Sequence, residues 1–210
     1  MIALALPVAV IFLPFAYLLG SIPFGYLIVK LREGRDIRAS GSGNIGATNV
    51  ARTAGPVAGV VTLLLDLAKG YAAVWLVGSL TKQHVASMVA AAVVAVLGHM
   101  FPVWLKFKGG KGVATGVGAF VLICWEAVAG ALVVWIVVVA IWRYVSLGSI
   151  IAAASLPLLT YGLYAARTEV QPTAVSIGTT LIAAMIIMKH KENIGRLVAG
   201  NENRLKLKKH

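Results

Sequence analysis

Long apolar runs, separated by short polar segments, constrain this chain more than any other feature. The run ALVVWIVVVAI is typical, because it holds no charge and does not alternate between polar and apolar positions. A membrane strand would show about ten residues of alternating polarity, whereas a membrane helix needs about 20 apolar residues. With 60% hydrophobic and 12% charged residues, the chain is expected to be an all-α integral membrane protein.

The apolar runs predict a bundle of about seven transmembrane helices in a single membrane-embedded domain, 1–210. The expected spans are 2–29, 55–80, 84–104, 113–125, 127–142, 150–166 and 172–188. The first lacks a basic leading segment and is too long for a signal-peptide core, so it is expected to be retained. The fourth holds only about 13 residues before Glu126, which is assigned to a loop. This segment is expected to be a half-helix or to start from a recessed loop, and five spans is the alternative count.

The distribution of basic residues predicts the orientation of the bundle. Of the 19 Lys and Arg residues, 16 fall in one set of alternate loops, Lys82 and Arg167 fall in the other, and Lys69 lies within a span. Because cytoplasmic loops collect Lys and Arg, the N-terminus is expected outside and the C-terminus inside. The basic run NRLKLKKH at the C-terminus is interpreted as a topology signal or a contact with anionic lipid.

Four polar segments are expected to converge on the cytoplasmic side. They are RASGSGNIGATNVAR (38–52), GHMFPVWLKFKGGKGVATGVG (98–118), RYVSLGS (143–149) and KHKENIGR (189–196). Glycines allow the backbone to turn N–H groups toward an anion, and nearby Lys and Arg supply positive charge. One glycine loop alone is most often a turn, and one basic loop alone a topology signal. Together the four segments predict a phosphate-binding site.

Several other chemistries do not fit. A Walker A loop would need a glycine where Leu105 stands. The four histidines have no paired ligand spacing, so a catalytic metal is not expected. No cofactor is expected either. The single Cys124 rules out a disulfide framework. Asp66 and Lys69, three residues apart in one span, can neutralise each other, and a direct role of Lys69 in substrate binding is the alternative.

Six segments resemble the signatures of the PlsY family, the bacterial acyl-phosphate:glycerol-3-phosphate acyltransferases. They are GSIPFGY (20–26), SGNIGATNVAR (42–52), DLAKG (66–70), GHMFPVWLKFKGGKGVAT (98–115), YVSLGS (144–149) and HKENIGRL (190–197). The resemblance implies transfer of a fatty acyl group from acyl phosphate to glycerol 3-phosphate, with lysophosphatidic acid and phosphate as products. It also implies multi-pass location in the bacterial inner membrane, with the active site facing the cytoplasm. The implied partners are the two substrates, membrane lipid and the enzyme that makes acyl phosphate; no nucleic acid is expected.

The resemblance also assigns site residues, position by position. The expected catalytic residues are Ser42, Arg52, Lys111, His190 and Asn193. The expected substrate-binding residues are Gly43, Asn44, Thr48, Asn49, Gly109, Gly110, Gly112 and Ser146, and Lys69 is added because a charge within a span usually serves function. Glu192 is expected to be structural.

The expected mechanism depends on positioning. Arg52 and Lys111 are expected to clamp phosphate, since Arg binds it as a fork and Lys as a point charge. Ser42 lacks a neighbouring base in its own segment, so we expect a hydrogen-bond donor rather than a nucleophile. The proton acceptor is expected to be the substrate's own phosphate, with His190 as the alternative. A phosphate transporter and a structural scaffold are the alternative functions, but transporters usually bind near the midplane between repeats.

Overall fold

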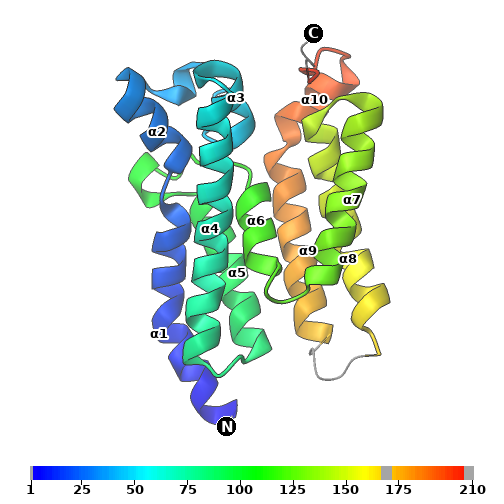
Figure 1. Ribbon diagram of the computed structural model, residues 1–210. Coiled ribbons are helices and arrows are strands. Elements are labelled where there is room, and N and C mark those ends of the chain that lie inside the picture. Colours follow the sequence, from blue (N-terminus) through cyan, green and yellow to red (C-terminus); the bar gives the residue numbers. More distant parts are fainter. Residues whose placement is uncertain (1, 167–171, 206–210) are drawn as a thin grey trace. The chain divides into compact units, whose positions relative to one another are not determined.

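The structure is a computed structural model that describes residues 2–166 and 172–205 (Figure 1). These residues form helices and connecting loops and contain no strand, which confirms the expected all-α class. The chain packs as two compact units, Met1–Ile123 and Cys124–His210. That both units serve one functional domain, 1–210, stays a prediction.

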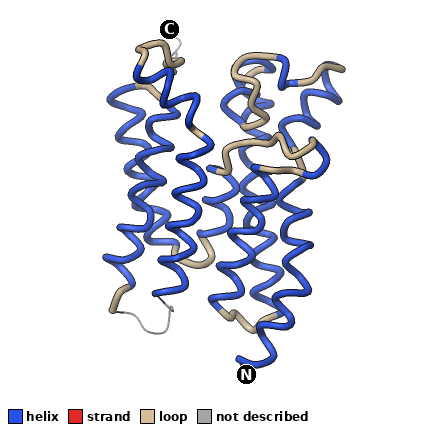
Figure 2. The backbone as a smooth tube through the Cα atoms, turned by 180° about the vertical axis from the view of Figure 1, so that it is seen from behind, coloured by secondary structure: helices blue, strands red, loops and turns tan. Residues whose placement is uncertain are grey.

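The first unit is built around the long central helix α4. Its helices are α1 (Ile2–Ser21), α2 (Phe24–Glu33), α3 (Ala47–Ala54), α4 (Pro56–Leu80), α5 (Val85–Met100) and α6 (Val113–Phe120), with short 3₁₀ turns η1 (Ile37–Ala39) and η2 (Val103–Leu105). Helix α4 packs against α1, α3, α5 and α6, and α1 packs along α5 (Figure 2). The small residues of α5 allow this close packing. A Cβ on Gly98, for example, would meet Ser21 Oγ at 3.0 Å.

The first expected span, 2–29, is interrupted at Pro23. Proline has no N–H group, and it disfavours helical geometry in the residue before it. Helix α1 therefore ends at Ser21, and α2 begins at Phe24. The carbonyl of Ile22, left out of the helical ladder, accepts a hydrogen bond from Lys69 Nζ at 2.7 Å. The two helices together still form one candidate span, Ile11–Glu33.

The fourth expected span, 113–125, is much shorter than a membrane crossing. Helix α6 has 8 residues, and at 1.5 Å per residue it extends only about 12 Å. The structure therefore favours the half-helix interpretation of this segment. Within the described ranges, six helices are long and apolar enough to span a membrane. The count of seven spans and the orientation stay predictions.

The second unit contains three long helices and one short one. They are α7 (Trp125–Trp142), α8 (Val145–Tyr164), α9 (Pro172–Lys189) and α10 (Lys191–Val198). Helix α8 packs between α7 and α9, and α10 contacts the ends of α8 and α9.

Two sequence expectations about the second unit are wrong. Helix α8 starts at Val145 rather than near 150, so most of the segment expected as the polar loop 143–149 is helical. Glu126 lies in the first turn of α7 rather than in a loop, and it accepts a hydrogen bond from the Tyr164 hydroxyl. A carboxylate is favoured there because the N-terminus of a helix is partly positive. Arg167, assigned to the sparsely charged loops, lies outside the described residues.

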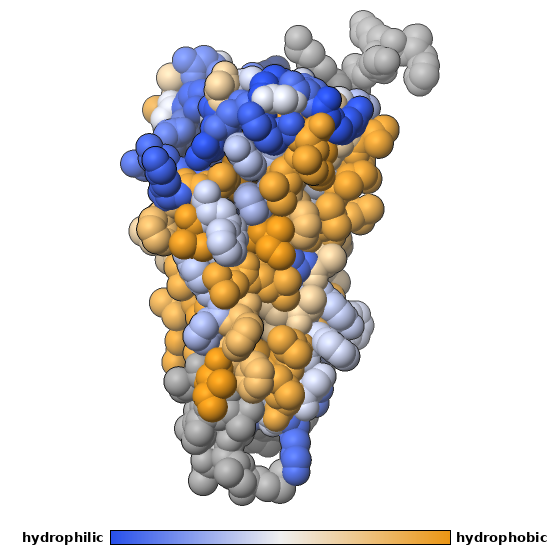
Figure 3. Space-filling view, turned by 90° about the vertical axis from the view of Figure 1, so that its left-hand side faces the viewer, coloured by the Kyte–Doolittle hydropathy of each residue, from blue (hydrophilic) through white to orange (hydrophobic). Residues whose placement is uncertain are grey.

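Polar and apolar side chains separate on the surface. Figure 3 shows hydrophilic side chains gathered at one end of a face and hydrophobic side chains covering the flank beneath them. Exposed apolar side chains in the first unit include Phe15, Leu18 and Trp104, which are 57%, 41% and 60% exposed. A flank of this kind would be costly in water and is suited to lipid.

Candidate active site

The polar loop between α2 and α3 is held in shape by its own charged residues. Asp36 accepts hydrogen bonds from Arg38 N at 2.9 Å and from Arg38 Nη2 at 2.6 Å. The hydrogen bond with Arg38 lowers the pKa of Asp36, and the same bond raises the pKa of Arg38. Arg35 ties the loop to α3, since it donates to Ser40 Oγ at 2.7 Å and to the Thr53 carbonyl at 2.9 Å. Two arginines therefore serve the fold of this loop.

Asn49, only 3% exposed, organises the centre of the same loop. Its Nδ2 donates to the carbonyls of Ser40 at 3.0 Å and Asn44 at 2.8 Å, and its Oδ1 accepts from Ser42 N at 2.9 Å. Gly41 has a φ of 61°, and a Cβ there would overlap Asn49 Oδ1. The structure thus gives Asn49 a clear role in shaping the loop, and its expected contact with substrate stays a prediction.

Three other expected residues of this loop region leave their side chains available for a ligand. Ser42 is half-buried, and Thr48 and Arg52 on α3 are exposed. The side chains of all three make no hydrogen bond or ion pair with the residues that the structure describes. Asn44 differs, because its Oδ1 accepts from Gly46 N at 2.8 Å and shapes the start of α3. The neighbouring Gly43 is exposed and has a φ of 69°.

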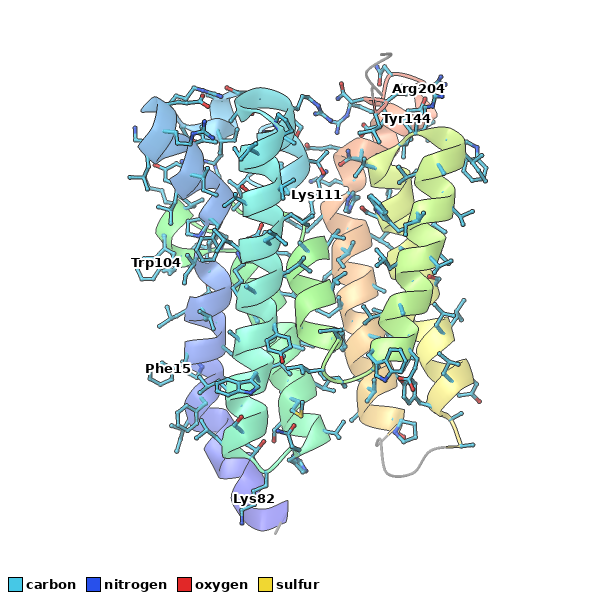
Figure 4. All side chains as sticks on the ribbon, viewed as in Figure 1. Phe15, Lys82, Trp104, Lys111, Tyr144 and Arg204 are labelled. Atoms are coloured by element: carbon cyan, nitrogen blue, oxygen red, sulfur yellow. The ribbon has the colours of Figure 1, made fainter. Side chains whose placement is uncertain are left out.

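The glycine-lysine loop leads from α5 into α6. The amides of Gly109 and Gly110 donate to the carbonyls of Met100 at 3.2 Å and His99 at 3.0 Å. These two amides therefore hold the loop against the end of α5 rather than pointing toward an anion, contrary to the expectation for glycines here. Gly112, with a φ of 83°, precedes the first residue of α6. Lys111 therefore lies beside a helix N-terminus, where its charge and the helix dipole both favour an anion (Figure 4).

The structure brings the polar loop and the glycine-lysine loop together within the first unit. Leu105 is buried in one apolar cluster with Ile37, Ile45 and Val50. Arg38 Nη1 also donates to the Leu105 carbonyl at 3.5 Å. Two segments that are distant in sequence thus lie side by side because they share a small core.

The polar groups of the second unit gather around a glutamate that the sequence analysis missed. Glu202 Oε1 accepts from Ser146 Oγ at 2.9 Å and from Asn193 Nδ2 at 2.7 Å, and its Oε2 pairs with Arg196 Nε at 2.7 Å. Burial raises the pKa of Glu202, but the hydrogen bonds from Arg196, Asn193 and Ser146 outweigh it, so the pKa is lowered. The sequence feature that could have pointed to Glu202 is its position as one acidic residue in an otherwise basic C-terminal run.

The remaining residues expected in this part of the site lie at the junction of α9 and α10. His190 is 3% exposed, and its Nδ1 lies 2.8 Å from the carbonyl oxygen of Ile186. A carbonyl only accepts, so Nδ1 carries a proton and donates it to this bond. Glu192, expected to be structural, is exposed, whereas Glu202 has the buried contacts of a structural acid.

Comparison with known proteins identifies the family of this chain. Residues 10–200 match the family model described as glycerol-3-phosphate acyltransferase. The chain belongs to the glycerol-3-phosphate acyltransferase family. The family region includes every site residue expected from the sequence and ends just before Glu202.

Individual relatives agree with this assignment. The glycerol-3-phosphate acyltransferase of Syntrophotalea carbinolica is 49% identical over 191 residues, covering 91% of this chain and 94% of that protein. The glycerol-3-phosphate acyltransferase of Trichlorobacter lovleyi is 50% identical over 192 residues, covering 91% and 94%. A crystal structure of PlsY (YgiH), an integral membrane glycerol 3-phosphate acyltransferase, in its glycerol 3-phosphate form has a TM-score of 0.85 and 41% identity. It covers 94% of this chain and 96% of its own. This chain is therefore an integral, multi-pass membrane acyltransferase.

One expected binding residue of this acyltransferase lies in its interior. Lys69 is 3% exposed, and its Nζ lies 2.7 Å from Asp66 Oδ1. The same ammonium donates to the Ile22 carbonyl and lies 5.6 Å from the centre of the Phe24 ring. These contacts favour the structural-pair interpretation, and a direct contact of Lys69 with substrate stays a prediction.

Proposed function

We propose that this acyltransferase moves a fatty acyl group from acyl phosphate to glycerol 3-phosphate and releases lysophosphatidic acid and inorganic phosphate. Its relatives carry the name glycerol-3-phosphate acyltransferase. Two similar crystal structures of PlsY (YgiH) are a glycerol 3-phosphate form and a lysophosphatidic acid form, and the second is 39% identical to this chain. In this proposal the reaction takes place at the cytoplasmic face of the bacterial inner membrane, and the enzyme that makes acyl phosphate is a further partner.

The single observation that carries this proposal is the set of polar side chains left available beside the glycine-lysine loop. The side chains of Ser42, Thr48 and Arg52 form no hydrogen bond or ion pair within the described part of the chain, and Lys111 stands in the adjacent loop at a helix N-terminus. Both substrates carry phosphate, so their charges repel each other at short range. A forked guanidinium and an ammonium can offset that repulsion and align the two substrates.

In this mechanism the hydroxyl oxygen of glycerol 3-phosphate attacks the acyl carbon, and the bond to the phosphate leaving group breaks. Ser42, which has no hydrogen-bonded base among the described residues, donates to a phosphate or to the developing oxyanion. The phosphate of glycerol 3-phosphate accepts the proton. Positioning can reach effective molarities of about 10⁵–10⁸ M, whereas a general base contributes about 10²–10⁴-fold. Positioning therefore outweighs the absence of a dedicated base.

The resemblance to the family implies roles for Ser146, His190 and Asn193 as well, and the proposal treats residues 1–210 as one acyltransferase domain. Asn193 and Ser146 are fixed by one buried carboxylate. In this proposal they orient substrate, and His190 binds or orients rather than accepting the proton.

The deciding experiment is phosphate release by purified protein in detergent. Phosphate should appear from acyl phosphate only when glycerol 3-phosphate is added, and lysophosphatidic acid should form in equal amount. Lys111→Ala should lose most of this activity. Lys82→Ala is the matched control, because Lys82 is an exposed lysine at the far end of the first unit (Figure 4). A protein that moves phosphate across vesicles without cleaving acyl phosphate would instead be a transporter.

A further inference from the structure

A cluster of ionisable side chains lies buried beneath the glycine-lysine loop, and the proposed chemistry does not use it. It consists of Asp66 and Lys69 on α4 and His99 on α5, which are 2%, 3% and 4% exposed. Asp66 Oδ1 lies 2.7 Å from Lys69 Nζ and 3.6 Å from His99 Nδ1. Burying charged groups in a membrane protein is costly, so such groups usually serve function.

His99 is the member of this cluster that meets the loop. Its carbonyl accepts from Gly110 N at 3.0 Å, so backbone and side chain of His99 both lie against this turn. A Cβ on Gly110 would come within 2.7 Å of His99 Cε1 and would overlap Nε2. Gly110 therefore rests directly on the imidazole ring. The ring therefore limits how close the Gly110 backbone, and the turn that carries Lys111, can lie to α5.

The opposite edge of the ring lies within ion-pair distance of Asp66. Nδ1 faces the carboxylate, and the carboxylate is in turn held by Lys69. Lys69 is anchored at the break between α1 and α2, where its ammonium donates to the Ile22 carbonyl at 2.7 Å. A continuous set of contacts therefore runs from the α1–α2 break through Lys69, Asp66 and His99 to Gly110.

We propose that Asp66 and His99 are positioning residues for glycerol 3-phosphate. Asp66 orients the His99 ring, the ring supports Gly110, and the supported turn presents Lys111 and the N-terminus of α6 to the phosphate. Neither residue touches substrate. This inference rests on the proposed function, in which the glycine-lysine loop binds glycerol 3-phosphate. A displacement of about 1 Å in a positioning group can cost about 10²-fold in rate.

The first test separates the two substrates. His99→Ala and Asp66→Asn should raise the KM for glycerol 3-phosphate about tenfold or more, and should leave the KM for acyl phosphate within about twofold. The matched control is Thr62→Val, since Thr62 is also buried on α4 and, among the described residues, its Oγ1 bonds only the Ala58 carbonyl of its own helix. Thr62→Val should change neither KM. Equal increases of both KM values in the His99 and Asp66 variants would overturn the proposal.

The second test uses the contact between Gly110 and the ring. Gly110→Ala should weaken glycerol 3-phosphate binding, because its Cβ would push against His99. Combined with His99→Ala, the same substitution should cost little more, because the obstructing ring is gone. Gly109→Ala is the control, since its Cβ would meet the backbone oxygens of His99 and Met100 and the Pro102 ring, which His99→Ala does not remove. Losses that simply multiply in the Gly110→Ala/His99→Ala double variant would contradict the proposal.

A binding measurement separates this inference from the proposed reaction. Calorimetric titration with glycerol 3-phosphate alone needs no acyl donor, so it reports on the loop even if the donor is not acyl phosphate. Weaker binding by His99→Ala, with wild-type binding intact, supports the positioning role. Unchanged binding overturns it, whatever the phosphate-release assay shows. If His99→Ala does not fold, the same titration can be made on His99→Gln and Gly110→Ala, because both variants keep a large side chain at position 99.

Discussion

The three hydrogen bonds of Asn49 make a sharp prediction about the polar loop. The change is Asn49→Ala, which removes the donor to the Ser40 and Asn44 carbonyls and the acceptor for Ser42 N. Each hydrogen bond contributes about 0.5–1.5 kcal/mol, so three contribute about 1.5–4.5 kcal/mol to loop order. At about 1.4 kcal/mol per factor of ten, a central loss of about 3 kcal/mol corresponds to about a hundredfold. We expect kcat/KM to fall by about that factor.

Hydrogen exchange at the Ser42 amide distinguishes a scaffold from a substrate contact. In the substrate-free protein this amide should be protected by Asn49 Oδ1. Asn49→Ala should abolish the protection. Asn49→Asp, which keeps an acceptor oxygen but lacks both Nδ2 donors, should retain part of it while the Ser40 and Asn44 contacts are lost.

The control is Thr48→Ala, because Thr48 is the preceding, exposed residue of α3 and its side chain has no hydrogen bond to the described part of the chain. It should leave the exchange of Ser42 N unchanged. Undiminished protection of Ser42 N in Asn49→Ala, together with a rise in KM alone, would refute the scaffold reasoning and make Asn49 a substrate contact.

Four further outcomes are expected. Lys111→Ala should raise the KM for glycerol 3-phosphate far more than that for acyl phosphate; equal effects would contradict the loop assignment. Arg52→Lys should lose activity because the fork is lost although the charge remains, and full activity would show that the fork is irrelevant. His190→Ala should keep the acidic limb of the pH profile of kcat, and its disappearance would make His190 the base. Because the pKa of Glu202 is lowered, its carboxylate stabilises the folded protein above pH 4.5, and this stability is lost as pH falls through the lowered pKa. Glu202→Gln should therefore unfold at a lower temperature than wild type at pH 7, and its unfolding temperature should not show this loss at acid pH.

The membrane class and the main spans could be predicted from the sequence because they depend on local composition. Spans 55–80 and 172–188 agree closely with α4 (Pro56–Leu80) and α9 (Pro172–Lys189). Helix boundaries at polar residues were predicted less well. The start of α8 was missed because Ser146 and Ser149 look like loop residues, yet Ser149 bonds the Val145 carbonyl of its own helix. A serine can satisfy its hydroxyl within a helix, and residue type alone does not reveal that.

In the candidate site, too, some residues could be predicted from the sequence and others could not. Residue types and motif order pointed to Ser42, Arg52 and Lys111 as phosphate ligands, since phosphate recognition requires these functional groups wherever the chain places them. The structural role of Asn49 could not be predicted from the sequence, because it depends on the distances from its side-chain amide to three backbone groups. The direction of the glycine amides could not be predicted either. Gly109 and Gly110 were expected to turn their amides toward an anion, but in the structure both amides donate to carbonyls at the end of α5.

By itself, the sequence determined that this chain is a helical membrane protein of the glycerol-3-phosphate acyltransferase family with a large excess of basic residues. Those properties follow from apolar length, charge and the order of motifs, which are all local along the chain. Only the tertiary structure decided which polar residues support the fold and which remain available for substrate. It paired His99 with Gly110 and Asp66, and it placed Glu202 against Asn193. Such pairings arise from packing between segments distant in sequence, where distance and burial determine what each polar group does.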